Sequence, residues 1–137
     1  MTIKYQSGKT VTVIADGTCK GNDSIGTEPK ISPDKKLVGL LTGVHFNDSA
    51  NNYYFAGSRL CSFKEGKCVL KLSGEKYFIE EWHFWEKGTQ LILRSRAKHG
   101  VGTVERYDAT TGKLLEKFLE YKVDATYPEW ARRIALL

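Results

Sequence analysis

The feature that most constrains the fold of this chain is a recurring pattern: an extended segment, a polar turn that ends in glycine, and a second extended segment. A Gly-Lys pair followed by a mixed apolar segment occurs at residues 8–11, 66–69 and 112–115. The last two copies each follow a short extended segment, at residues 59–62 and 104–107. Glycine readily adopts the left-handed backbone conformation that such turns need, so both copies are predicted to be β-hairpins.

A second recurring unit joins an extended segment to a strongly apolar strand through a tight polar turn. It spans residues 30–41 and again residues 83–93. Together the two units predict two four-stranded antiparallel meanders, at about 29–72 and 79–119, which matches the spacing of about 45 residues per propeller blade. At 137 residues the chain has a common single-domain length. The sequence therefore predicts one all-β domain, residues 1–137, with a flanking N-terminal hairpin.

The C-terminal tail fits two structures. Trp130, Ile134 and Leu137 follow Pro128 at helical spacing, which favours a short terminal helix. A Glu-Trp pair in the tail repeats the pair at residues 81–82, which would instead begin a third blade. Because Ala, Arg and Leu are strong helix formers, the helix is the preferred prediction.

Composition and motifs exclude several classes of protein. Hydrophobic residues make up 41% and charged residues 27%, an ordinary globular mixture that argues against disorder. The longest apolar run, near residues 37–41, is far shorter than the roughly 20 residues that a membrane helix needs. The first eight residues lack the pattern of a secretory signal, so we expect the chain as written to be cytoplasmic, or periplasmic if a signal has been removed. The location is left open.

Neither catalysis nor a cofactor is predicted. The three histidines are widely separated, and no metal-ligand spacing of cysteine and histidine occurs. No Gly-x-Ser-x-Gly nucleophile motif is present. We therefore expect a protein that is not an enzyme and that binds no metal.

The net charge of +5 favours acidic partners without demanding nucleic acid. The aromatic residues at 77–85 are interleaved with three glutamates that would repel phosphate, so nucleic-acid binding is not predicted. Strand alternation instead places Phe78, Trp82 and Phe84 together on a core-facing side.

A basic row follows these aromatics. In the segment 91–98, the period of two puts Leu91, Leu93, Ser95 and Ala97 on one face and Ile92, Arg94, Arg96 and Lys98 on the other. One interpretation is a solvated face or an edge strand protected by charge. The other is that the row and the following loop, with His99 and Gly100, dock into an acidic cleft on a partner.

Two segments carry a resemblance to a known family. Residues 32–38 resemble the turn between the first two strands of WD40-like and TolB-like propeller blades, and residues 107–113 resemble their outer hairpin. The similarity spans residues 29–119 and implies a blade architecture without specifying an activity. A closed propeller needs four or more blades, so two must close by stacking, by strand exchange or by dimerisation.

The predicted architecture also resembles small two-bladed periplasmic immunity proteins that neutralise type VI secretion amidases. In these proteins the inhibitory loop lies between the second and third strands of the second blade, which corresponds to residues 94–102 here. The resemblance implies a toxin or cell-wall amidase as the partner. This sequence departs from the family because its loop is basic rather than Ser-rich and no signal peptide is visible. The candidate contact residues are Arg94, Arg96, Lys98, His99 and Gly100, with His45 and Phe46 in the equivalent polar loop of the first blade.

The three cysteines leave their pairing open. Cys61 and Cys68 flank the predicted turn at 63–66, and a disulfide requires Cα atoms within roughly 7 Å. A two-residue turn at 64–65 would place them opposite each other, whereas a left-handed Gly66 shifts the register and leaves two buried thiols. Cys19 lies in a polar loop from which it could pair with either.

The sequence thus predicts a non-enzymatic protein-binding module, in the form of an immunity or inhibitor protein that occludes a partner's active site with the basic loop. Two alternatives remain open. One is a homo-oligomeric β-module whose blade edges complete each other across a two-fold axis. The other is a small-molecule binder with a pocket lined by Trp82, Trp85 and Trp130.

Overall fold

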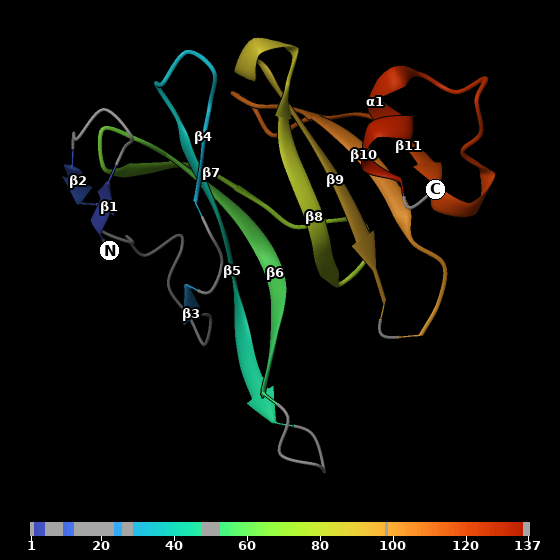
Figure 1. Cartoon of the computed structure of the whole chain (residues 1–137), viewed down its shortest axis with the longest axis horizontal. Helices are drawn as coiled ribbons and strands as arrows, with labels where there is room; N and C mark the ends of the chain where they lie inside the picture. The colour runs from blue at the N-terminus through green and yellow to red at the C-terminus, as the bar shows by residue number, and fades with distance from the viewer. Residues whose placement is uncertain are drawn as a thin grey trace.

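A computed structural model describes the backbone of residues 2–4, 10–12, 24–25, 29–47, 53–97 and 99–135. Two antiparallel sheets form the body of the molecule (Figure 1). The first contains β3 (Ser24–Ile25), β4 (Lys30–Ile31), β5 (Val38–Asn47), β6 (Tyr53–Lys64) and β7 (Lys67–Leu72), in the order β3-β5-β6-β7 with β4 also paired to β5. The second contains β8 (Phe78–Trp85), β9 (Gln90–Arg96), β10 (Thr103–Asp108) and β11 (Leu114–Leu119), in chain order.

The remaining elements are short. β1 (Thr2–Lys4) pairs with β2 (Thr10–Thr12), and two 3-10 turns, η1 (Glu86–Gly88) and η2 (Glu120–Lys122), follow β8 and β11. The helix α1 (Glu129–Ile134) comes last. The predictions of an all-β fold with two antiparallel meanders and of a C-terminal helix are therefore confirmed. Within the part of the chain described, no helix has the length and apolar character needed to span a membrane.

Glycine sets the register of the predicted hairpins. In the β6–β7 turn, Glu65 and Gly66 have φ of 52° and 82°, and Lys64 pairs with Lys67. Two consecutive residues with positive φ define a two-residue turn whose twist matches that of the flanking strands. Gly112, with φ of 74°, serves the turn between β10 and β11. Both glycines thus lie in hairpins, as the recurring pattern predicts.

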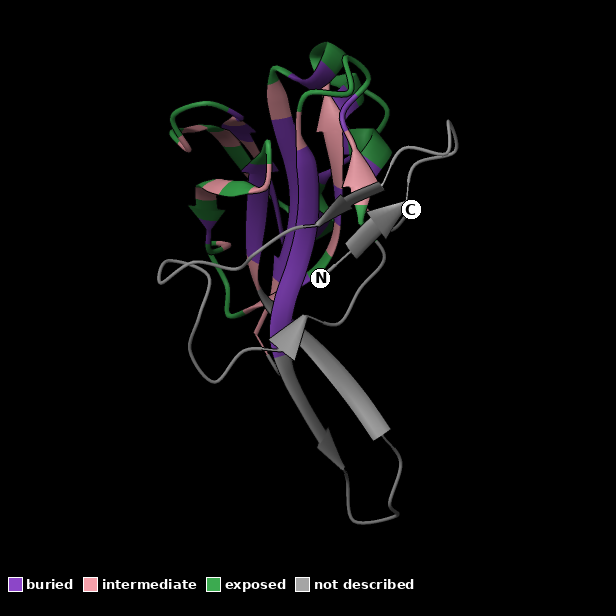
Figure 2. Ribbon diagram, turned by 90° about the vertical axis from the view of Figure 1, so that its left-hand side faces the viewer, coloured by how far each residue is buried: buried purple, intermediate pink, exposed green. Residues whose placement is uncertain are grey.

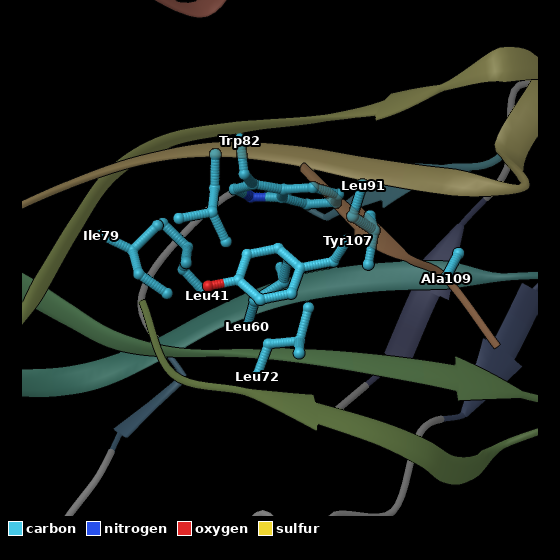
Figure 3. Packing of buried hydrophobic residues seen from close by; sticks show 9 residues of the cluster. Leu41, Leu60, Leu72, Ile79, Trp82, Leu91, Tyr107 and Ala109 are labelled. Atoms are coloured by element: carbon cyan, nitrogen blue, oxygen red, sulfur yellow. The ribbon is translucent and has the colours of Figure 1, made fainter. Parts of the chain in front are cut away.

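The two sheets pack face to face and share one core (Figure 3). The core residues are Leu41, Leu60 and Leu72 from the first sheet and Ile79, Trp82, Leu91, Leu93, Tyr107 and Ala109 from the second. The Trp82 ring lies so close to β5 that a Cβ at Gly39 would overlap it. Each meander therefore buries its inner face against the other within one chain.

The outer face of the second sheet is also buried. Ile92 and Val104 point away from the shared core and pack against Trp130, Ala131 and Ile134 of the C-terminal segment. The outer face of the first sheet holds a separate apolar cluster, made of Val38, Leu40, Cys61 and Phe63. Figure 2 shows the buried residues running along the central strands. Among the described residues, each sheet thus has buried apolar side chains on both faces.

A β-bulge in β8 corrects one prediction. The pairing of β8 with β9 shifts between Ile79 and Glu81, which inserts one extra residue. Beyond the shift Trp82 faces the core, and Phe84 packs against it, as predicted. The prediction is wrong for Phe78, because the bulge puts Ile79 in the core instead.

Candidate functional site

Exposed apolar side chains gather at the end of the second sheet that carries the β9–β10 loop. Tyr77, Val101, Leu119 and Tyr121 are 64%, 46%, 39% and 67% exposed, and they are four of the six exposed large hydrophobic residues in the described chain. We call these four side chains, together with loop residues 97 and 99–102, the loop-end surface. Figure 1 shows the β9–β10 loop at the lower end of this sheet.

Strand register brings the loop-end surface together. Ile79 pairs with Ser95, and Thr103 pairs with both Ser95 and Leu119, so these residues form one row across four strands. Tyr77, Val101 and Tyr121 each lie two residues beyond that row. Three separate connections of the chain therefore meet at one end of the sheet.

The β9–β10 loop is held from both sides. The Arg96 guanidinium donates to the Gly100 carbonyl at 2.9 Å and forms ion pairs at 2.5 Å with both Glu80 and Glu120. The Glu120 amide donates to the Gly102 carbonyl at 2.9 Å. A Cβ at Gly102 would collide with the Glu120 carboxylate, so a larger residue here would displace that side chain. Arg96 and Glu120 thus hold the described part of the loop at its Gly100 and Gly102 carbonyls.

Arg94 is not available to a partner, which corrects the predicted basic row. It is only 6% exposed, because α1 covers this face of the sheet. Its guanidinium donates to the Ile134 carbonyl at 2.8 Å and lies 3.2 Å from the Glu81 carboxylate. The alternation of the row is correct, but Arg94 joins α1 to the sheet, and the charge of Arg96 is matched by two glutamates.

The other predicted contact residues divide between the loop and the first sheet. His99 and Gly100 are exposed in the β9–β10 loop, and the side chain of Lys98 lies outside the described residues. His45 and Phe46 lie within β5, where they pair with Phe55 and Tyr54, so the loop predicted from residue 45 begins later. The side chains of both are outside the description, and the structure does not bring them to the loop-end surface.

The buried carboxyl of Glu105 bonds the segment before β8 to the strands beside the loop-end surface. Glu105 is fully buried and accepts hydrogen bonds from the Glu75 amide at 2.6 Å, the Ser95 hydroxyl at 2.6 Å and the Tyr107 hydroxyl at 2.8 Å. Burial raises the pKa of Glu105 and also that of Tyr107. These bonds fix the segment that carries Tyr77. The sequence signal for this cluster is that Ser95, Glu105 and Tyr107 fall on the inner face of two paired strands.

A cavity of about 220 Å³ opens beside the loop-end surface. Its lining is Glu75, Lys76, Thr103, Lys117, Phe118 and Leu119. At its rim the Lys117 ammonium lies 3.1 Å from the Glu75 carboxylate. The cavity is thus polar at the rim, and Leu119 links its lining to the exposed apolar group.

A second polar group lies on the outer face of the second sheet. The His83 ring contacts the Glu81 carboxylate at 2.8 Å and the Lys30 ammonium at 3.3 Å. Desolvation by burial lowers the pKa of His83. Within the described ranges, no three His, Cys, Asp or Glu side chains are grouped so as to hold a metal ion.

No protein-family model and no curated protein sequence matches this chain. The chemistry of the loop-end surface therefore rests on its own residues. Tyrosine combines a large apolar ring with a hydroxyl and is enriched at protein interfaces. Two of the four exposed apolar side chains of the loop-end surface are tyrosines.

The tryptophans do not form the predicted common pocket. Trp82 is 2% exposed in the core between the sheets, whereas Trp130 is 4% exposed on the opposite face of the second sheet. Trp85 packs against the Trp130 side. The prediction of a ligand pocket lined by all three is wrong, because the sheet itself separates them.

The pairing of β6 with β7 separates Cys61 from Cys68, as the alternative with a left-handed Gly66 predicts. Cys61 lies opposite Lys71, and Cys68 lies opposite Phe63, so the two are not cross-strand neighbours. Both are thiols in the structure, and the Cys68 sulfur donates to the Leu70 carbonyl at 3.6 Å. Cys19 lies outside the described residues.

Proposed function

We propose that this chain is a non-enzymatic protein-binding module and that the loop-end surface makes the contact. The observation that carries the proposal is the gathering of Tyr77, Val101, Leu119 and Tyr121, all exposed, around a loop fixed by Arg96. Tyrosine-rich apolar patches supply much of the binding energy at interfaces. Loop residues that are already held by hydrogen bonds in the free protein lose less entropy on binding.

The charge around the patch indicates the kind of partner. Lys76, Lys117 and Lys122 are exposed near the loop-end surface, and the chain carries a net charge of +5. Exposed lysines at the rim of an interface accelerate association with an acidic surface. The partner we propose is therefore a protein with an acidic cleft.

The specific form of this function is an inhibitor or immunity protein whose β9–β10 loop occludes the active site of a toxin or cell-wall amidase. The position of the loop, between the second and third strands of the second meander, supports this form through the resemblance noted in the sequence. The partner's enzymatic activity is then the decisive readout: stoichiometric addition of this chain abolishes it.

The chain offers a matched pair of positions for a crosslinking test. Val101 and Val69 are the same residue type and are 46% and 48% exposed, but Val69 lies on β7. A photo-crosslinking amino acid placed at Val101 is expected to capture a specific protein in cells of the source organism. The same amino acid placed at Val69 is expected to capture none of it.

The captured protein is then purified, and its affinity is measured against variants. We expect Val101→Ser with Tyr121→Ala to weaken binding about tenfold or more, which corresponds to roughly 1.4 kcal/mol. Val69→Ser should leave the affinity unchanged. Equal capture at both positions, or equal affinities, would remove the loop-end surface as the contact.

A further inference from the structure

We propose that the loop-end surface takes hold of its partner by strand addition: an acidic, extended segment of the partner pairs with the open edge of β11. This inference rests on the proposed function and specifies the partner's chemistry. Peptides recognised in this way gain affinity from main-chain hydrogen bonds and specificity from pockets that take alternate side chains.

The backbone of β11 has one edge directed away from its sheet. β11 is the outermost strand of the second sheet, and among the residues described it pairs only with β10. The Glu120 amide bonds to the Gly102 carbonyl, so the alternation of an antiparallel ladder directs the Phe118 amide toward β10 as well. The amides and carbonyls of Lys117 and Leu119 therefore point outward, where a further strand would lie.

The cavity lies directly beside that edge. Lys117 and Leu119 contribute to its lining, together with Thr103 and Lys76 from neighbouring parts of the fold. Its volume of about 220 Å³ is below the range of about 300–1,000 Å³ that is usual for small-molecule pockets. It suits one apolar side chain of an added strand, entering between the lysine side chains.

Charge selects an acidic segment. Lys76, Lys113 and Lys117 are all exposed along this edge. Glu116 accepts a hydrogen bond from Trp130 at 3.0 Å, and Glu75 lies 3.1 Å from Lys117. An acidic segment would therefore compete with Glu75 for Lys117 and would also meet Lys76 and Lys113. An added strand with Asp or Glu at alternate positions would meet the lysine side chains.

The same charge argues against a second copy of this chain as the occupant. Two β11 strands paired antiparallel and centred on Lys117 would place that residue opposite itself, and like charges directly opposite each other are destabilising. A lysine on an edge strand is a known device against self-association. An acidic strand placed opposite Lys117 would instead be attracted to it.

The test uses the full chain and random peptides of about 12 residues displayed on phage, roughly twice the mean strand length. Selection against the wild-type protein is expected to enrich acidic peptides with apolar residues at alternate positions. Binding of the most enriched synthetic peptide should fall about tenfold or more with Lys117→Glu. The matched control is Lys71→Glu on β7, the outermost strand of the first sheet, which should leave binding unchanged.

Amide hydrogen exchange tests the backbone pairing directly, because attraction between charged side chains alone would not protect backbone amides. Bound peptide should protect the amides of Lys117 and Leu119, while Phe118, already directed toward β10, changes little. Protection elsewhere, enrichment of peptides without acidic residues, or no enrichment overturns the inference. Concentration-dependent protection without peptide overturns it in favour of a second copy. Capture of a partner at Val101 with no protection at β11 would overturn strand addition alone and leave the proposed function standing.

Discussion

At the scale of single residues, the most consequential side chain is one that touches no solvent. Glu105 joins β10 to the segment before β8 through its bond with the Glu75 amide, and so places Tyr77 at the loop-end surface. Its carboxyl is surrounded by donors, yet burial dominates and raises its pKa above the ordinary value of 4.5. The folded state therefore holds this proton more tightly than the unfolded chain does.

The raised pKa of Glu105 predicts that the protein becomes less stable as the pH rises. As the pH rises above about 4.5 and through the raised pKa of Glu105, the unfolded chain releases the proton more readily, so the free energy of unfolding decreases. Glu105→Gln keeps the shape of the side chain and removes the charge. Urea unfolding at acidic and neutral pH should show a smaller pH-dependent loss in the variant. Identical pH dependence in both proteins would show that Glu105 does not titrate in this way.

At the scale of elements, α1 illustrates how little a short helix contributes alone. With six residues it is too short to be stable in isolation, so its packing on the second sheet must hold it. Ile134 is fully buried in that contact, and its carbonyl accepts from Arg94 at 2.8 Å. The helix is thus anchored by an apolar side chain and a buried cation together.

Shortening the Ile134 side chain should lower the stability of the protein. We expect Ile134→Ala to lower the free energy of unfolding by about 2–5 kcal/mol, because it leaves a cavity under α1. Leu115→Ala is the control: Leu115 is 40% exposed, and surface substitutions usually change stability by less than about 0.5 kcal/mol. Urea denaturation of both variants tests this, and equal losses would mean that α1 is not held by Ile134.

The elements also show what the sequence could predict. The hairpins at Gly66 and Gly112 and the alternation in β9 depend on local patterns, and the structure confirms them. The bulge in β8 was missed because one extra residue, Glu80, carries no distinct signal. The burial of Arg94 was missed because it depends on the C-terminal segment, 40 residues away along the chain, folding over β9.

For the candidate site, the sequence predicts the loop but not the side chains that surround it. The β9–β10 loop was predicted as the contact, and the structure places His99 and Gly100 exposed there. Tyr77 and Tyr121 were not predicted, since their exposure depends on which strand ends meet after folding. A pattern within one strand cannot reveal a surface assembled from three connections.

At the scale of the whole molecule, the shared core makes the two meanders depend on each other. Leu60, on β6, is 1% exposed and packs among residues of the second sheet. All three tryptophans lie beyond the first sheet, at Trp82 and Trp85 in β8 and Trp130 in α1. Tryptophan fluorescence therefore reports on the second half of the chain and, through Trp82, on the core that the two sheets share, whereas circular dichroism reports on the strands of both halves.

This separation of probes allows a test of cooperativity. Leu60→Ala removes a core side chain of the first sheet and should lower the free energy of unfolding by about 2–5 kcal/mol. If the chain unfolds in one step, the fluorescence midpoint and the circular dichroism midpoint in urea shift together, although the substitution is in the half that contains no tryptophan. A fluorescence midpoint that stays at the wild-type value would mean that the second meander and α1 are stable without the first. The face that the sheets share would then contribute far less than its burial implies.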